Sequence, residues 1–140
     1  MRHARSAGYT LLEIMVVVFI LGLLATLVVP RIAGRGDEAR HTKAIADMKA
    51  IEQALNLYRL DATGYPTTAQ GLAALVKRPD TPPVPKTWNP NGYLERVPVD
   101  PWGNAFVYLS DGTRFTLRSL GADGAEGGTG TAADLDSHDF

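Results

Sequence analysis

Cysteine is absent from the 140 residues of this chain. Disulfide bonds and a cysteine nucleophile are therefore excluded. Histidine is scarce as well, and the three that occur, His3, His41 and His138, are scattered along the sequence. No Ser-His-Asp pattern and no metal-hydrolase spacing accompanies them. An enzyme is therefore the weaker function class for this chain.

A strong net charge is also missing, because 14 basic and 15 acidic residues give a formal charge of −1. There is no basic stripe with interleaved aromatic residues, so nucleic-acid binding is not indicated. The length leaves room for only one modest soluble domain beside an apolar N-terminal run. Exported domains of this size often rely on disulfides, so another kind of cross-link is expected here.

Charged side chains are missing from residues 14–29, where the sequence reads IMVVVFILGLLATLVV. With Tyr9 to Leu12 added, a helix of this run is about 31 Å long, enough to cross the apolar core of a bilayer. Pro30 is the first interruption and marks a kink or the membrane exit. The sequence therefore predicts a transmembrane helix over residues 9–35 and a soluble head over residues 36–140.

Glu13 is the one charged residue within the predicted transmembrane helix before Pro30. A carboxylate at membrane depth costs about 3 kcal/mol on insertion scales, so an acid there is a candidate functional residue. The alternative is that Glu13 lies near the membrane surface and reaches water.

The residues before this run form a short basic leader, MRHARSAG, which ends in the small residue Gly8. An ordinary secretory signal has its cleavage site after the apolar region, and no Ala-x-Ala follows Val29. Cleavage after Gly8 would remove the leader, residues 1–8, and keep the helix. The sequence GYTLLE, which ends at Glu13, resembles the class III signal of type IV pilins and pseudopilins.

That resemblance implies a processing step and a role for Glu13. In that family a prepilin peptidase cuts after the glycine and N-methylates the new first residue, here Tyr9, where phenylalanine is commoner. The acid at the fifth mature position, Glu13, then meets the α-amino group of an incoming or neighbouring subunit. Two groups that are each costly in lipid become tolerable once they are paired.

A second helical pattern runs over residues 39–60. Its apolar residues recur at spacings of three and four, which places them in one stripe: Ala44, Met48, Ile51, Leu55 and Tyr58. Such a stripe is more often packed against the protein's own sheet than used as a ligand site. Gly64 is suited to a left-handed cap, with Pro66 just beyond it. Residues 9–60 are thus predicted to form one long helix.

The rest of the head is predicted to contain short elements. Thr67 and Gln70 have the spacing of a capping box, which indicates a short helix to about Lys77. After a proline-rich loop, alternating residues predict strands at 105–109 and 115–119 around the turn SDGT. Tyr93 and Trp102 are expected to anchor the core. Two or three short antiparallel strands against the long helix make an α+β fold.

Sequence blocks throughout the head make the resemblance narrower. YPTTAQGL, NGYL, VPVDPWGN and SLGADGAEGGTGTAADL stand in the order found in the major pseudopilin family of type II secretion, general secretion pathway protein G. The departures are small: Ala69 stands where the family often has glutamate, and the chain ends in SHDF rather than a tryptophan-containing tail. The resemblance implies a type IV pilin-like fold, with one long N-terminal helix packed on a small antiparallel sheet and a C-terminal loop.

The same resemblance implies a structural role. Subunits would polymerise through their N-terminal helices into a periplasmic pseudopilus that pushes folded exoproteins through the outer membrane. The expected partners are further copies of the chain, minor pseudopilins, the prepilin peptidase and methylase, and an inner-membrane assembly platform. Before assembly, a single pass would anchor the chain in the bacterial inner membrane with its head in the periplasm. The alternative is a major type IV pilin-like fibre subunit, but those usually close a C-terminal loop with a disulfide.

The segment from Gly121 to Phe140 contains five acidic residues and no Lys or Arg. Carboxylates and the carbonyls that glycines expose are ligands that Ca²⁺ prefers, although the spacing is not that of an EF-hand. From the residues alone, a frayed acidic tail is the alternative. The resembled family binds Ca²⁺ in this loop, which implies Asp123 and Asp134 as ligands and adds backbone oxygens of Leu120 and Ala125 as candidates. Such a cation would be the cross-link that disulfides supply elsewhere.

Overall fold

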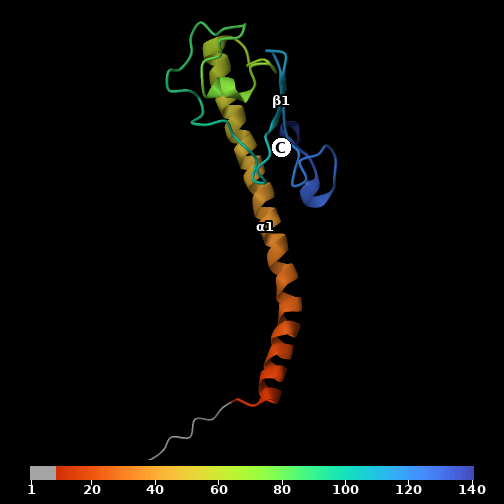
Figure 1. Cartoon of the computed structure of the whole chain (residues 1–140). Helices are drawn as coiled ribbons and strands as arrows, with labels where there is room; N and C mark the ends of the chain where they lie inside the picture. The colour runs from red at the N-terminus through yellow and green to blue at the C-terminus, as the bar shows by residue number, and fades with distance from the viewer. Residues whose placement is uncertain (1–8) are drawn as a thin grey trace, which may run out of the picture. The chain divides into compact units, whose positions relative to one another are not determined.

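The computed structural model describes residues 9–140, and for residues 27–35 it describes the backbone only. The chain divides into two compact units, residues 1–37 and residues 38–140. The long helix α1 (Leu11–Ala62) contributes to both units, so the predicted long N-terminal helix is confirmed (Figure 1). The elements after α1 are the 3-10 helices η1 (Leu72–Leu75), η2 (Gly130–Ala132) and η3 (Ser137–Asp139) and the strands β1 (Val107–Ser110), β2 (Phe115–Ser119) and β3 (Leu135–Asp136).

The core of the second unit is built on the predicted stripe of α1. All five residues of that stripe are buried, with at most 2% of their surface exposed. They pack in one cluster with residues of η1 and of the three strands, among them Leu75, Tyr108, Leu117 and Leu135. The 3.6-residue period of the helix accounts for this burial, because it turns every third or fourth side chain toward the same partner.

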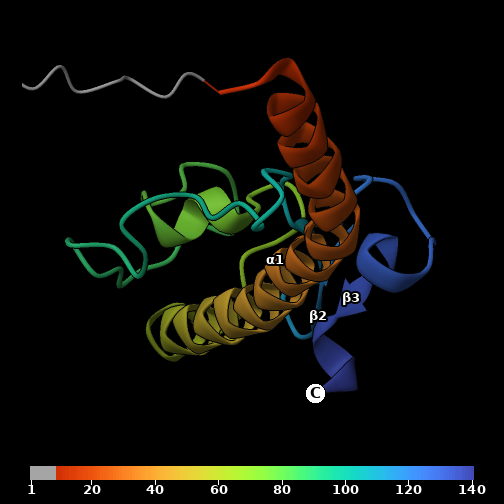
Figure 2. The same cartoon turned by 90° about the horizontal axis from the view of Figure 1, so that it is seen from below.

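The sheet is antiparallel with the strand order β1-β2-β3. In its register Tyr108 lies opposite Leu117, and both side chains are buried. β1 begins later than predicted, because Ala105 makes only an isolated bridge to Val99. β3 is only two residues long and adds a third strand to the two whose positions were predicted (Figure 2). The α+β, type IV pilin-like architecture is thereby confirmed.

The cap of α1 differs from the prediction. Thr63, with φ 64°, takes the left-handed conformation that was expected of Gly64. Gly64 is required for another reason, because a Cβ there would come within 2.9 Å of the Gly112 carbonyl oxygen. That oxygen also accepts a 2.8 Å hydrogen bond from Tyr65 N. The end of α1 is therefore fastened to the β1–β2 turn.

The capping box of Thr67 and Gln70 forms as predicted, but the helix after it is shorter than expected. Thr67 N donates to Gln70 Oε1 at 3.0 Å, and Gln70 N donates to Thr67 Oγ1 at 3.4 Å. Gly71 follows with φ 60°, a left-handed conformation that interrupts a helix. Only the single 3-10 turn η1 forms beyond it, and it ends before Lys77.

The proline-rich segment lies around the C-terminal end of α1 (Figure 1). Trp88 Nε1 donates to the Ala74 carbonyl at 3.1 Å, and Tyr93 OH donates to Asp61 Oδ2 at 2.6 Å. Tyr93 and Trp102 are half-buried and pack against the core, as predicted.

Candidate functional site

The first candidate site is the N-terminal end of α1. Thr10 caps the helix, because its Oγ1 accepts a 3.2 Å hydrogen bond from Glu13 N. Glu13 therefore lies in the first turn, where the helix dipole favours a carboxylate. Within the part of the chain that the structure describes, this carboxylate makes no ion pair. Gly8, the predicted cleavage residue, lies outside the described residues, and Tyr9 next to it is exposed.

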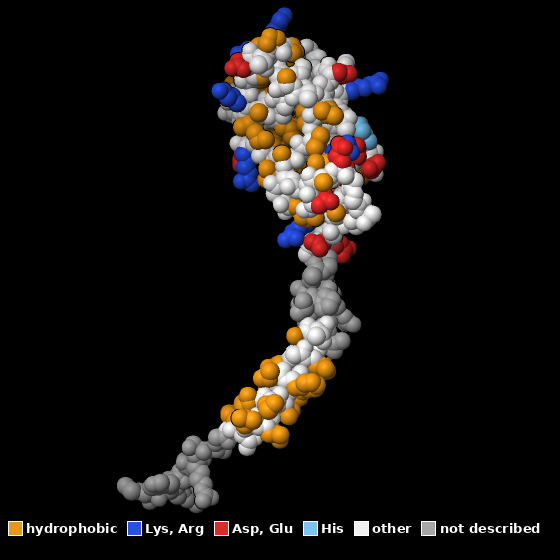
Figure 3. Space-filling view, turned by 45° about the vertical axis from the view of Figure 1, so that its right-hand side comes forward, with side chains coloured by type: hydrophobic (Ala, Val, Ile, Leu, Met, Phe, Trp, Pro, Cys, Tyr) orange, Lys and Arg blue, Asp and Glu red, His pale blue; other side chains and the backbone are white. Residues whose placement is uncertain are grey.

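The apolar side chains that follow are exposed on every side of α1. From Leu11 to Leu24 the large hydrophobic residues have 48–79% of their surface exposed (Figure 3). A helix that is apolar all round is normally buried in a membrane or in a protein interior. Over the residues described with side chains, no helix has an apolar stretch long enough to span a membrane. Residues 27–35 of the predicted span are outside that description.

The second candidate site is the C-terminal loop, residues 120–134, which connects β2 to β3. Its glycines at positions 121, 124, 127, 128 and 130 all have positive φ. At position 128 glycine is also required for steric reasons, because a Cβ there would come within 2.3 Å of the Ala132 carbonyl oxygen. Ala122 N donates to the Thr131 carbonyl at 3.0 Å, which ties the two arms of the loop together. Hydrogen bonds within the segment thus close it into a loop.

The turn at residues 100–104 supports this loop. Asn104 Nδ2 donates to the Gly121 carbonyl at 3.0 Å. A Cβ on Gly124 would lie 3.1 Å from Asn104 Oδ1, so Asn104 also lies close to the backbone of the loop. The two sequence blocks DPWGN and LGADG are therefore in contact.

The predicted metal ligands differ in their surroundings. Asp123 Oδ1 accepts a 3.1 Å hydrogen bond from Ala125 N, so this carboxylate bends back on its own backbone. Asp134 Oδ2 accepts from Gly127 N at 3.2 Å and from Arg118 at 3.2 Å. The other oxygen, Asp134 Oδ1, is buried and has no hydrogen-bond partner. A buried acceptor without a donor is a costly state that a bound cation would relieve.

The described residues thus fit a calcium ion in part. Asp134 Oδ1 offers an anionic ligand without a hydrogen-bond partner, in a loop whose glycines have positive φ. Among the residues described, however, no three His, Cys, Asp or Glu side chains come close enough together to hold a metal. A cation there would depend on backbone oxygens as well as on Asp123 and Asp134.

Arg118 is the important residue of this site that sequence reasoning did not find. It lies on β2, opposite Asp136 of β3, and its guanidinium points at three acidic residues of the C-terminal segment. The alternation along β2 places Arg118 on the same face as Thr116, away from the buried Leu117. Nothing in the sequence reveals which acids return to that face.

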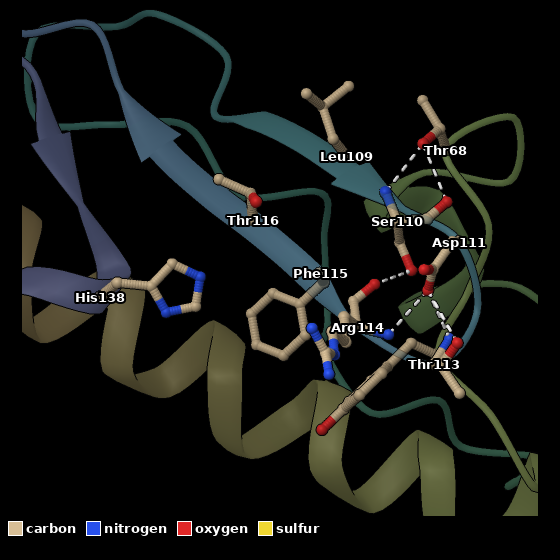
Figure 4. Close-up of a pocket in the computed structure, with 10 residues that line it drawn as sticks. Thr68, Leu109, Ser110, Asp111, Thr113, Arg114, Phe115, Thr116 and His138 are labelled. Atoms are coloured by element: carbon tan, nitrogen blue, oxygen red, sulfur yellow. Dashed lines mark hydrogen bonds between the residues drawn. The ribbon is translucent and has the colours of Figure 1, made fainter.

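A hollow of about 680 Å³ lies at the β1–β2 hairpin (Figure 4). Its lining includes Ser110, Asp111, Phe115 and His138. Ser110 Oγ donates to the Arg114 carbonyl at 2.8 Å, and Asp111 Oδ1 accepts from Thr113 N and Arg114 N, both at 2.8 Å. The hydrogen bond from Arg114 N contributes most to lowering the pKa of the Asp111 carboxyl, and the one from Thr113 N adds to it. The Ser110 and Asp111 side chains therefore stabilise the turn, and neither is paired with the imidazole of His138.

Comparison with known proteins bears on both sites. The family described as "Type II secretion system (T2SS), protein G" matches residues 31–138. The chain belongs to this family. A second family, "Prokaryotic N-terminal methylation motif", matches residues 3–29, which include Gly8, Tyr9 and Glu13.

Relatives and a solved structure agree with this membership. The type II secretion system core protein G of Pseudomonas aeruginosa is 55% identical over 99% of both chains. The type II secretion system core protein G of Vibrio cholerae is 52% identical, and the match covers 94% of this chain and 90% of the Vibrio cholerae chain. The crystal structure of the major pseudopilin from the type 2 secretion system of enterohaemorrhagic Escherichia coli is similar with a TM-score of 0.64. The two chains are 39% identical, and the match covers 74% of this chain and 86% of the chain in the crystal structure.

Proposed function

We propose that the protein is a structural subunit of the periplasmic pseudopilus of a type II secretion system. One observation carries the proposal: the helix from Leu11 to Leu24 exposes apolar side chains on all sides and contains a single charge, Glu13. Such a surface is stable only in lipid or against similar helices. Membership of the protein G family and the methylation motif support the same assignment. The role requires no catalytic centre.

In this proposal the subunit passes through two environments. The chain first anchors in the bacterial inner membrane by its apolar helix, with residues 38–140 in the periplasm. A prepilin peptidase cleaves after Gly8 and methylates Tyr9, and an assembly platform moves the subunit into a homopolymer capped by minor pseudopilins. Glu13 then pairs with the free α-amino group of a neighbouring copy. The growing filament pushes folded exoproteins through the outer membrane.

The C-terminal loop has its own part in the proposal. Asp123 and Asp134, with the backbone oxygens of Leu120 and Ala125, would hold a calcium ion. The unpartnered Asp134 Oδ1 supports this assignment. The ion would supply the cross-link between the two ends of the loop in a head without cysteine.

A photo-crosslinking amino acid at Phe19 tests the polymer. Phe19 is 71% exposed in the single chain, so a reactive group there reports on what covers this helix. In cells with the complete secretion system, illumination should give a ladder of oligomers of this chain. In matched cells without the assembly ATPase, the same label should give the monomer alone. No ladder in complete cells, or an equal ladder in both, would contradict the proposal.

A further inference from the structure

Asparagine is followed by glycine at one place in this chain, Asn91-Gly92. The sequence has four asparagines, and the residue after each one decides how easily its side chain can react with the backbone. Asn89 precedes a proline, which has no N–H, whereas Asn56 and Asn104 precede residues that carry side chains. Glycine has no Cβ, so Gly92 N is the least hindered of the four backbone nitrogens.

The reaction open to such a pair is deamidation. The nitrogen of Gly92, after losing its proton, attacks Cγ of the Asn91 side chain. A bond forms between these two atoms, the bond from Cγ to Nδ2 breaks, and Nδ2 takes up a proton and leaves as ammonia. Water then opens the five-membered ring, which converts Asn91 to aspartate or isoaspartate. The reaction needs only water, and it makes asparagine one of the thermolabile residues.

The structure places this pair in a tight turn of the proline-rich segment, residues 78–92. The Asn91 side chain is exposed. Gly92 N donates to the Asn89 carbonyl at 2.8 Å, and Asn91 N donates to Asn89 Oδ1 at 3.1 Å. Ring closure turns the peptide between Asn91 and Gly92 toward the Asn91 side chain, so Gly92 N must first leave the Asn89 carbonyl. The attacking nitrogen is therefore occupied as long as the turn is closed.

Glycine is required at position 92. Its φ is 75°, a left-handed conformation, and a Cβ there would come within 3.2 Å of the Val76 carbonyl oxygen and 3.3 Å of the Leu75 carbonyl oxygen. The chain thus passes close to the backbone at the end of η1, and only glycine fits. The reactive pair follows from this close approach together with the asparagine that stands before it.

The isoaspartate product would disturb the contacts that follow the turn, because it adds one methylene group to the backbone. Tyr93 N and Leu94 N both donate to the Leu75 carbonyl, at 2.7 and 3.1 Å. Tyr93 OH also accepts a 3.2 Å hydrogen bond from Asn89 N, on the other side of the turn. A longer backbone between Asn89 and Tyr93 strains these contacts, so the modified turn would favour the open form.

We propose that Asn91 is the deamidation site of this protein, that the closed turn protects it, and that the modification marks chains in which the proline-rich segment has opened. The reaction proceeds from the open fraction of molecules, so its rate reports the local opening of this turn. The inference concerns one chain alone and is independent of the polymer and of the calcium site.

Peptide mapping by mass spectrometry of the full chain in detergent micelles tests this inference. Trypsin releases residues 87–96, whose asparagines are Asn89 and Asn91 alone. After incubation of the folded chain in mildly alkaline buffer, this peptide should show little of the mass gain that accompanies conversion of an amide to a carboxyl group. In guanidinium chloride the gain should be about tenfold faster or more, because the turn is then open in every molecule.

Three variants locate the effect. Asn91→Gln retains an amide but would need a six-membered ring, so the gain in denaturant should disappear. Tyr93→Phe removes the hydroxyl that accepts from Asn89 N, and the gain in the folded chain should become about fivefold faster. Tyr65→Phe is the matched control, because it removes a hydroxyl that is hydrogen-bonded elsewhere in the head. Its rate in the folded chain should equal that of the wild type.

Four results would overturn the inference. Equal rates in the folded and the unfolded chain would show that the closed turn gives no protection, and a gain that persists in Asn91→Gln would place the reaction at another residue. The absence of any gain in denaturant would mean that Asn91 does not react. Equal acceleration by Tyr93→Phe and Tyr65→Phe would mean that the whole head opens, rather than this turn.

Discussion

Ser119 Oγ donates a 2.8 Å hydrogen bond to Asp100 Oδ2, and both residues are buried, with 0% and 3% of their surface exposed. The other oxygen, Asp100 Oδ1, accepts from Trp102 N at 3.1 Å and from Asn104 N at 2.7 Å. A buried carboxylate is tolerated when its oxygens are supplied with donors. Asp100 thus closes the turn at residues 100–104 and fixes it to the end of β2, directly beneath the C-terminal loop.

Asp100→Ala should therefore be strongly destabilising. The Ser119 hydroxyl and two backbone N–H groups would lose their acceptor in a buried site, which lowers the free energy of unfolding by about 3 kcal/mol. The melting temperature of the full chain in micelles, followed by circular dichroism, should fall by about 12 °C or more.

Asp111→Ala is the control for that measurement. Asp111 also accepts from two backbone N–H groups of a turn, but it is exposed, so water replaces the lost acceptor. Its loss should therefore lower the melting temperature much less than Asp100→Ala does. Equal effects of the two substitutions would show that the burial of Asp100 is not the cause.

The elements that the sequence predicts best are those with a periodic, local pattern of residues. The stripe from Ala44 to Tyr58 is buried as predicted, because a helix repeats every 3.6 residues whatever packs against it. The capping box of Thr67 and Gln70 forms for the same reason, since its residues are three apart. The long helix and the α+β class follow from such patterns.

Features that depend on long-range pairing were missed. The two residues of β3 carry no alternation, so their pairing with Arg118 and Ser119 could not be derived. The three acids around Arg118 are identified only once the register of β2 and β3 is known. Similarly, Gly71 with its positive φ shortens η1, and a capping-box pattern does not reveal the conformation of the residue that follows it.

Processing at Gly8 gives the next prediction. Mass spectrometry of the protein extracted from membranes should find Tyr9 as the first residue, heavier by the mass of one methyl group. A large residue in Gly8→Val should block the peptidase and leave the full-length precursor. A mature protein that still begins at Met1, or that begins after the apolar run, would contradict the proposed signal.

Tyr108 predicts how the stability of the head depends on pH. Burial raises the pKa of the Tyr108 hydroxyl to about 12, and that hydroxyl donates a 2.7 Å hydrogen bond to the Pro66 carbonyl. In the unfolded chain a tyrosine ionises near pH 10. The stabilisation by neutral Tyr108 is therefore complete below pH 10 and is lost as the pH rises from about 10 to 12.

Tyr108→Phe tests this dependence, because phenylalanine cannot ionise. At pH 8 the variant should be less stable than the wild type by about 1 kcal/mol, since the Pro66 carbonyl loses its donor. The difference should shrink as the pH rises above 10, because ionised Tyr108 no longer donates to the Pro66 carbonyl. Urea denaturation at several pH values measures it, with Tyr9→Phe as the control for an exposed tyrosine. A difference that stays constant to pH 12 would contradict the role of Tyr108.

Calcium should stabilise the head through the C-terminal loop. A ligand that binds the native state alone adds about 2.7 kcal/mol at a hundredfold excess over its Kd. The melting temperature of the full chain should rise with Ca²⁺ and much less with Mg²⁺, which requires tighter octahedral geometry. Asp123→Ala should abolish the rise, and Glu126→Ala should affect it less. Asp134→Ala should abolish it too, but that change also removes the contact with Arg118.

The melting curve in chelator is the reference for this experiment. If it coincides with the curve in Ca²⁺, the loop binds no calcium and depends on its internal contacts alone. If Mg²⁺ has the same effect as Ca²⁺, the response is general screening of the acidic residues.

Glu13 should be required for assembly and not for insertion. Glu13→Leu removes a cost of about 3 kcal/mol for a carboxylate at membrane depth, so the monomer should remain in the membrane in normal amount. The α-amino group of a neighbouring copy would then lack its counter-charge, and the ladder obtained from the label at Phe19 should disappear. Met15→Leu is the control, because it exchanges one exposed apolar residue of the same helix for another. Filaments in normal yield from Glu13→Leu would mean that the carboxylate is only tolerated in this helix. Loss of the monomer from the membrane would mean instead that Glu13 is needed for insertion.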